Sequence, residues 1–188
     1  MTHKIHIALI VCLLAVFPAE GRADGSSFDL AETAGTLRVW RLADGLPSDS
    51  VAAILQTRGG FLWVGTSAGL VRFDGIKFTP LPLTAFPTNS PVSVTSLCED
   101  TGGSLWIGTL QDGLFELKTG QVSHFTLSQG LLDDSVTSLD ADKSGQVWIG
   151  TKSGLNLWTG HELKSYTQRD GLPDKFVAGV NVARSGTV

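Results

Sequence analysis

A tetrapeptide, Trp-x-Gly-Thr, occurs three times in this chain and constrains its fold more than any other feature. The copies lie at residues 63–66, 106–109 and 148–151, spaced 43 and 42 residues apart. Twelve residues before each tryptophan stands a valine, and three or four residues after each threonine comes Gly-Leu. Features that recur in register at such a period indicate a repeat protein, in which each unit stacks on the next.

Each repeat is predicted to form four short strands. The first strands are expected at 51–56, 94–99 and 136–141, and the second at 61–66, 104–109 and 146–151. The third begins at each Gly-Leu, and the fourth follows Gly75, Gly120 or Gly160. The second strands are apolar at consecutive positions, which is typical of strands buried on both faces. Sheets stacked on both sides are found in propellers, so the sequence predicts an all-β β-propeller built of four-stranded antiparallel blades.

The repeated motif residues are interpreted as structural. Trp63 and Gly65 are two residues apart on a strand, so they face the same way, and the missing side chain lets the neighbouring blade approach. The glycines that follow each threonine are expected to adopt positive φ in a tight turn. The structural set is Trp63, Gly65, Thr66, Trp106, Gly108, Thr109, Trp148, Gly150 and Thr151.

The repeats predict an incomplete ring. Three full blades are expected at approximately 51–82, 94–127 and 136–167, with a partial fourth at 177–188. Trp40 lies five residues before Gly45-Leu46, as Phe125 and Tyr166 lie before their own Gly-Leu pairs. Residues 37–42 are therefore predicted to be a fourth strand without a preceding blade, which closes the ring against sequence outside these residues.

The N-terminus resembles a secretory signal peptide. Residues 7–17 form an uninterrupted apolar run of eleven residues after a weakly basic start. Such a run is too short for a bilayer, which requires about 20 residues, although an uncleaved anchor or a buried strand is the alternative. We predict a signal peptide at 1–23, cleavage between Ala23 and Asp24, a linker at 24–36, and export to the periplasmic side of the inner membrane.

No catalytic, metal or cofactor site is recognisable in the residues. His124 and His161 stand alone and are expected to face solvent, and Cys98 is expected to be an inert packed thiol. The segment 140–145 resembles the start of a calcium loop, but Thr151 stands where a bidentate glutamate is needed. The net charge is −4 and no Lys/Arg cluster occurs, which argues against nucleic acid as a partner. We expect no enzyme activity from this chain.

Ligand binding is predicted on one rim of the propeller. Because strands alternate in direction, the second-to-third and fourth-to-first connections share a rim, here called the loop rim. Loops on a rigid scaffold are where binding usually sits. The candidate ligand-binding residues on this rim are Asp49, Gln111, Asp112, Asp134 and Lys152. The alternative is that they are solvated turn residues.

The motif and its surroundings resemble the two-component regulator propeller repeat. The resemblance is carried by residues 60–66, 103–109 and 145–151, and by Asp-Gly-Leu-Pro at 44–47 and 170–173. The first repeat departs from it, since its connection to the second carries four prolines, at 80, 82, 87 and 91. The resemblance implies the extracytoplasmic ligand-sensing region of a membrane signalling protein. In that family a β-sandwich, a transmembrane helix and a cytoplasmic histidine kinase or diguanylate cyclase follow.

The resemblance leaves several expectations. The partner is an extracytoplasmic ligand of unknown identity, with carbohydrate one candidate, and the full-length protein is expected to dimerise and to meet the membrane only through a downstream segment. Two alternatives are an exported quinoprotein-type dehydrogenase and a secreted binding or scaffold propeller. Quinoprotein repeats have four residues from Gly to Trp, whereas Gly103 and Trp106 here are three apart. This spacing favours the sensor.

Overall fold

The computed structural model describes residues 38–82, 86, 88, 90–183 and 188, and these form three four-stranded antiparallel sheets. Blade 1 contains β1 (Val51–Gln56), β2 (Leu62–Thr66), β3 (Gly69–Phe73) and β4 (Phe78–Pro80). Blade 2 contains β5 (Val94–Glu99), β6 (Leu105–Thr109), β7 (Leu114–Lys118) and β8 (Gln121–Phe125). Blade 3 contains β9 (Val136–Ala141), β10 (Val147–Thr151), β11 (Leu155–Trp158) and β12 (Leu163–Tyr166).

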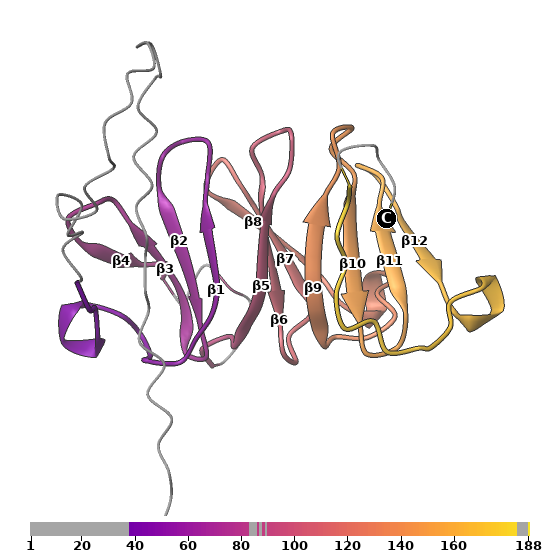
Figure 1. The fold of residues 1–188 in the computed structure, drawn as a ribbon, viewed down its shortest axis with the longest axis horizontal. Coiled ribbons are helices and arrows are strands. Elements are labelled where there is room, and N and C mark those ends of the chain that lie inside the picture. The colour runs from indigo at the N-terminus through magenta and orange to yellow at the C-terminus, as the bar shows by residue number, and fades with distance from the viewer. Residues whose placement is uncertain (1–37, 83–85, 87, 89, 184–187) are drawn as a thin grey trace, which may run out of the picture.

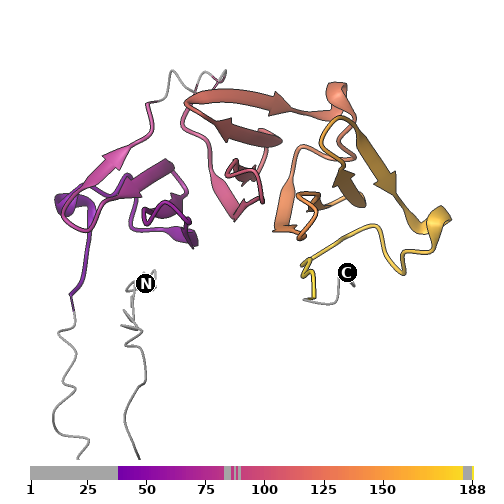
Figure 2. The same ribbon diagram turned by 90° about the horizontal axis from the view of Figure 1, so that it is seen from above.

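The blades stand side by side in an open arc, with β1, β5 and β9 on its inner side (Figures 1 and 2). In every blade each strand pairs with the next one along the chain. The predicted all-β fold, an incomplete propeller of four-stranded antiparallel blades, is therefore confirmed. The second strands begin at 62, 105 and 147, one residue later than predicted.

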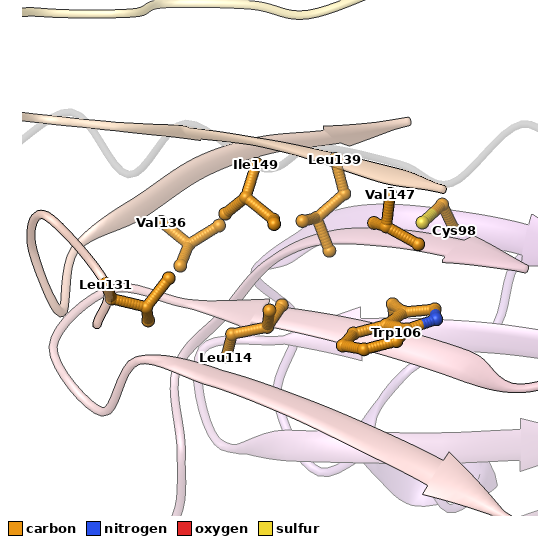
Figure 3. Close-up of a cluster of buried hydrophobic side chains, with 8 residues drawn as sticks. All are labelled: Cys98, Trp106, Leu114, Leu131, Val136, Leu139, Val147 and Ile149. Carbon is orange, nitrogen blue, oxygen red and sulfur yellow. The ribbon is translucent and has the colours of Figure 1, made fainter. Parts of the chain in front are cut away.

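The blades are held together by side chains from both faces of the second strands. Leu105 and Ile107 of β6 pack in a cluster that includes Trp63 of blade 1. Trp106, between them in sequence, points the other way into a cluster with Val147 and other residues of blade 3, as Figure 3 shows. This two-sided burial explains why consecutive apolar residues are needed in these strands.

The motif glycines allow the next blade to approach. A β-carbon placed on Gly65 would lie 2.4 Å from Val94 Cγ1, and one on Gly108 would lie 2.6 Å from Val136 Cγ1. Both valines are the first residues of the next blade's inner strand. A real β-carbon does not fit at these distances, so a glycine is required for this packing.

The motif threonines hold the turn that follows each second strand. Their Oγ1 atoms donate to the carbonyl oxygens of Gly69, Gly113 and Gly154 at 2.9, 2.7 and 2.8 Å, and accept from a backbone N–H inside the turn. These three glycines have φ of +129°, +76° and +149°, as predicted. The turn thus needs both a hydroxyl and a residue that tolerates positive φ.

The predicted strand over residues 37–42 is not formed in its described part, 38–42. Leu42–Asp44 is instead a 3₁₀ helix, η1, equivalent to η3 (Leu127–Gln129) and η4 (Gln168–Asp170), which follow β8 and β12. A strand needs a neighbour to pair with, and the described residues contain no earlier third strand. Trp40 nevertheless packs its ring on Phe73 at 5.5 Å, as Phe125 packs on Trp158 at 5.0 Å.

No strand forms over residues 177–183, where the sequence predicts the start of a partial fourth blade. Thr137 Oγ1 donates to the Val177 carbonyl at 2.5 Å, just as Thr95 Oγ1 donates to the Val136 carbonyl at 2.7 Å. Val182 N donates to Asp140 Oδ2 at 2.7 Å. This segment therefore lies beside β9 as β9 lies beside β5, but a ladder needs a second strand that the described residues do not contain.

The predicted signal peptide, the cleavage site between Ala23 and Asp24, and the linker lie outside the described residues. Within the described part of the chain, no helix has the length and apolar character needed to cross a bilayer.

Candidate functional site

The loop rim is the lower edge of the arc in Figure 1, and its loops are of two kinds. The second-to-third connections are short turns after the motif threonines. The fourth-to-first connections are longer, and three of them contain η1, η3 and η4. All five candidate ligand-binding residues lie in these loops.

Four of the five candidates surround one junction, between blades 2 and 3. Gly113 N, next to Gln111 and Asp112, donates to the Asp134 carbonyl at 2.9 Å, which joins blade 2 to the connection 126–135. Lys152 N donates to the Ser135 carbonyl at 3.3 Å, which joins the same connection to blade 3. We call residues 111–113, 130–135 and 152–153 the junction site. Asp49 is not part of it and lies at the start of blade 1.

Two of the candidate carboxylates serve the fold. Asp134 Oδ1 accepts from Leu127 N at 2.8 Å, and Asp49 Oδ1 accepts from Leu42 N at 3.1 Å. Both bonds hold the first residue of a 3₁₀ helix, and they recur at equivalent positions. The turn interpretation therefore accounts for one oxygen of each carboxylate, and the other oxygen has no hydrogen bond from any described residue.

The other three candidates have side chains that the fold does not engage. The side chains of Gln111, Asp112 and Lys152 make no hydrogen bond or ion pair with any other described residue. Gln111 and Lys152 are exposed, and Asp112 is half-buried. An amide, a carboxylate and an ammonium group are thus presented around one junction without competing internal partners.

Asp133 is a further residue of the junction site, which the sequence pattern indicated only as a turn residue and not as one of the five candidates. Its Oδ1 accepts from Ser135 N at 2.8 Å, and its Oδ2 accepts from Ser153 Oγ at 2.7 Å, which ties the connection to the blade 3 turn. At the blade 1 junction Ser48 makes the same kind of link, to Ser67 Oγ at 2.9 Å. The signal was available: a short polar residue stands three positions before the repeat valine in both cases.

His124 does not simply face solvent as expected, whereas His161 does, with 78% of its side chain exposed. The ring of His124 is half-buried and stacks on Phe115 with centroids 4.2 Å apart and planes 9° apart. Its Nε2 lies 2.7 Å from the Asp112 carbonyl oxygen. Because a carbonyl only accepts, this nitrogen donates. His124 therefore supports the blade 2 turn of the junction site, a contact between strands that spacing could not predict.

Cys98 is buried between blades 2 and 3 (Figure 3). Burial raises the pKa of its thiol strongly, and the negative charges of Asp140 and Asp100 raise it further. The thiol is therefore protonated at neutral pH and is a poor nucleophile. No group of three or more metal-ligating side chains is assembled among the described residues.

The hairpin at 140–145 is a hydrogen-bonded turn. Asp142 Oδ1 accepts from Ser144 N, Ser144 Oγ and Gln146 N at 2.8, 2.6 and 2.9 Å. Burial works to raise the pKa of Asp142, but the hydrogen bonds from Ser144 and Gln146 outweigh it and lower the pKa. This oxygen is saturated by the protein itself.

Comparison with known proteins agrees with this geometry. The family model described as two component regulator propeller matches residues 45–68, 89–111 and 130–153. The extracellular domain of the hybrid two-component system BT4673 of B. thetaiotaomicron is 27% identical over 80% of the chain, with a TM-score of 0.68. That of BT3049 from the same organism is 27% identical over 74%, with a TM-score of 0.65. The chain spans 21% and 20% of those two structures, about a fifth of their length.

More distant structures share only the fold. Virginiamycin B lyase of Staphylococcus aureus is 15% identical over 71% of the chain and 45% of its own length, with a TM-score of 0.57. No curated protein matches the chain in sequence. The recurrent Trp-x-Gly-Thr strands, the stacked four-stranded blades and the three matches show that this chain carries three repeats of the two-component regulator propeller type.

Proposed function

We propose that the chain is part of the extracytoplasmic ligand-sensing propeller of a membrane signal-transduction protein. The observation that carries the proposal is the similarity, over 80% of the chain, to the extracellular domain of a hybrid two-component system. A histidine kinase or diguanylate cyclase output, a transmembrane segment and dimerisation in the intact protein are parts of this proposal. The quinoprotein alternative has no support among these matches.

The ligand is proposed to bind at the junction site. Binding there would contact blade 2 through Gln111 and Asp112 and blade 3 through Lys152, so it would act on how two blades meet. The unengaged groups are an amide, a carboxylate and an ammonium. This mixture suits a polar ligand with many hydroxyl groups, such as an oligosaccharide, better than an apolar one.

The first experiment screens the intact protein against oligosaccharides of varied composition by thermal shift. A ligand that binds only the folded state stabilises it by RT ln(1 + [L]/Kd), so the melting temperature rises as the ligand concentration exceeds its Kd. Any oligosaccharide that does so is then titrated against the variants Asp112→Asn and Lys152→Ala. The matched control is Lys118→Ala, because Lys118 is an exposed lysine on the opposite rim.

We expect the junction variants to weaken binding about 5- to 20-fold, as the loss of one polar contact does, and the Lys118 variant to bind as the wild type does. Equal affinity in all variants would place the ligand elsewhere. If no oligosaccharide stabilises the protein, the proposed ligand class is wrong.

A further inference from the structure

The connection that leads into blade 3 differs from its counterparts at one position. The connections at the start of blade 1 and after blade 3 read Gly45-Leu46-Pro47 and Gly171-Leu172-Pro173, whereas this one reads Gly130-Leu131-Leu132. The turns are alike, since Leu131 N and Leu172 N each donate back five residues, at 3.1 and 3.2 Å. Proline has no N–H, so among these three connections only the one into blade 3 has a backbone donor at this position.

That donor is matched by a second departure, in the third strand of the same blade. Leu132 N donates to Asn156 Oδ1 at 3.0 Å, and Asn156 is fully buried. The strand register places Asn156 opposite Ile149, where blades 1 and 2 have Val71 and Phe115. The buried amide therefore stands where the other two blades have apolar side chains.

Asn156 is held from both ends of its amide. Its Nδ2 donates to Ser165 Oγ at 2.9 Å and to the Gly130 carbonyl at 3.2 Å. Asn156 is thus hydrogen-bonded to the backbone on both sides of Leu131. A buried amide costs stability unless its bonds are made, and here they are made to the backbone that leads into the junction site.

The side chain of Leu132 completes the arrangement. A β-carbon on Gly154 would lie 2.4 Å from Leu132 Cδ1, so the leucine is seated over this glycine. At the equivalent Gly69 of blade 1 no atom lies within 4 Å of such a carbon. The contacts of Leu132 with Gly154 and Asn156 therefore have no counterpart at the blade 1 junction.

We infer that Asn156 is a positioning residue for the junction site. It fixes residues 130–135, which carry Asp133 and Asp134, by side-chain hydrogen bonds, whereas a proline ring occupies the equivalent place in two other connections. The relevance to ligand sensing rests on the proposed function, but the positioning itself does not.

The test uses the intact protein without ligand, and compares Asn156→Val, Asn156→Asp and the pair Asn156→Val with Leu132→Pro. Amide hydrogen exchange is followed at Gly113 and Ser135, whose N–H groups bond to Asp134 and Asp133. Amides in β1 and β2 are the internal control.

Asn156→Val removes the partner of the half-buried Leu132 N–H and one partner of the Gly130 carbonyl. We expect exchange at Gly113 and Ser135 to rise roughly 5- to 100-fold, with blade 1 unchanged. Asn156→Asp keeps the acceptor for Leu132 but loses the amide donors, so its effect is intermediate. The paired variant removes the orphaned N–H and restores exchange to within about threefold of wild type.

If Asn156 were only a packing residue, valine would be tolerated as it is in blade 1, and exchange at Gly113 and Ser135 would stay at the wild-type rate. That result overturns the inference, and so does a paired variant no better protected than Asn156→Val alone. If Asn156→Val does not fold, the comparison of Asn156→Asp with wild type still decides. None of these outcomes depends on a ligand, so they are independent of whether the proposed function holds.

Discussion

The substitution Gly108→Ala tests whether the motif glycine is needed for blade packing. The added β-carbon would lie 2.4 Å from Ser96 Oγ and 2.6 Å from Val136 Cγ1, and both neighbours are on inner strands with little room to move. Overpacking of this kind costs about 1–3 kcal/mol. It is offset by about 0.5–1 kcal/mol, because alanine loses less chain entropy than glycine on folding. Since Gly108 is not at positive φ, backbone strain adds nothing to this cost.

We therefore expect a net loss of about 1–2 kcal/mol in the free energy of unfolding, a 5- to 30-fold change in the folded-to-unfolded ratio. The assay is urea denaturation of the intact protein followed by tryptophan fluorescence. Gly59→Ala is the matched control, because its β-carbon would meet only Phe61 Cδ2, at 3.8 Å, with ordinary φ.

Combining Gly108→Ala with a second substitution, Ser96→Ala, tests the same reasoning more specifically. The Ser96 hydroxyl has no hydrogen-bond partner among the residues that the structure describes, so Ser96→Ala should be nearly neutral by itself. It removes the shortest contact, and the cost of Gly108→Ala should fall when the two are combined. The reasoning is refuted if Gly108→Ala is no more destabilising than Gly59→Ala, or if the Ser96 background leaves its cost unchanged.

Three further outcomes are expected. Thr109→Val removes the hydroxyl that donates to Gly113 O and accepts from the turn, and should lower the free energy of unfolding by about 1–3 kcal/mol in the same assay. Cys98 should resist iodoacetamide up to pH 9 in the folded protein and react on unfolding, because burial raises its pKa; rapid labelling of the native state would be incompatible with this. The folded-state pKa of Asp142 is lowered from 3.8, so its stabilising contribution is present above that pH and is lost as the pH falls through the lower folded value. Asp142→Ala should therefore lose less stability than the wild type between pH 5 and pH 2, as measured by thermal unfolding across that range.

The repeated chemistry made the blades predictable. The motif residues make contacts that repeat in every blade: Gly108 faces the first valine of the next blade, and Thr109 bonds within its own turn. The spacing of these residues is therefore sufficient to predict the blade architecture. Three copies of the same pattern supplied an internal comparison that a single strand cannot.

The ends of the repeat array could not be predicted in the same way. Trp40 and Val177 occupy the positions that their spacing implies, yet neither lies in a strand. A β-ladder forms only when two neighbouring strands are both present. The repeat spacing locates one strand of such a pair, but it does not show whether the second strand is there.

The details of the junction site depend on contacts between distant segments. Asn156 and Leu132 are 24 residues apart. Each is a single substitution relative to the equivalent positions of the other repeats, so the sequence gives no indication that the two residues contact each other. The stacking of His124 on Phe115 likewise follows from pairing between β7 and β8. The sequence was sufficient to assign loop residues to one rim. Only the structure shows which of their carboxylates are already hydrogen-bonded to the backbone.

Labelling of Lys152→Cys from outside the cell tests the account most directly. Spheroplasts that carry the intact protein are treated with a membrane-impermeant maleimide, with and without the oligosaccharide that gives the largest thermal shift, and Lys118→Cys is the control. The account predicts that both positions are labelled without lysis and that the oligosaccharide protects Lys152→Cys alone. Labelling only after lysis, or protection at Lys118→Cys instead, would contradict an extracytoplasmic sensor that binds at the junction of blades 2 and 3.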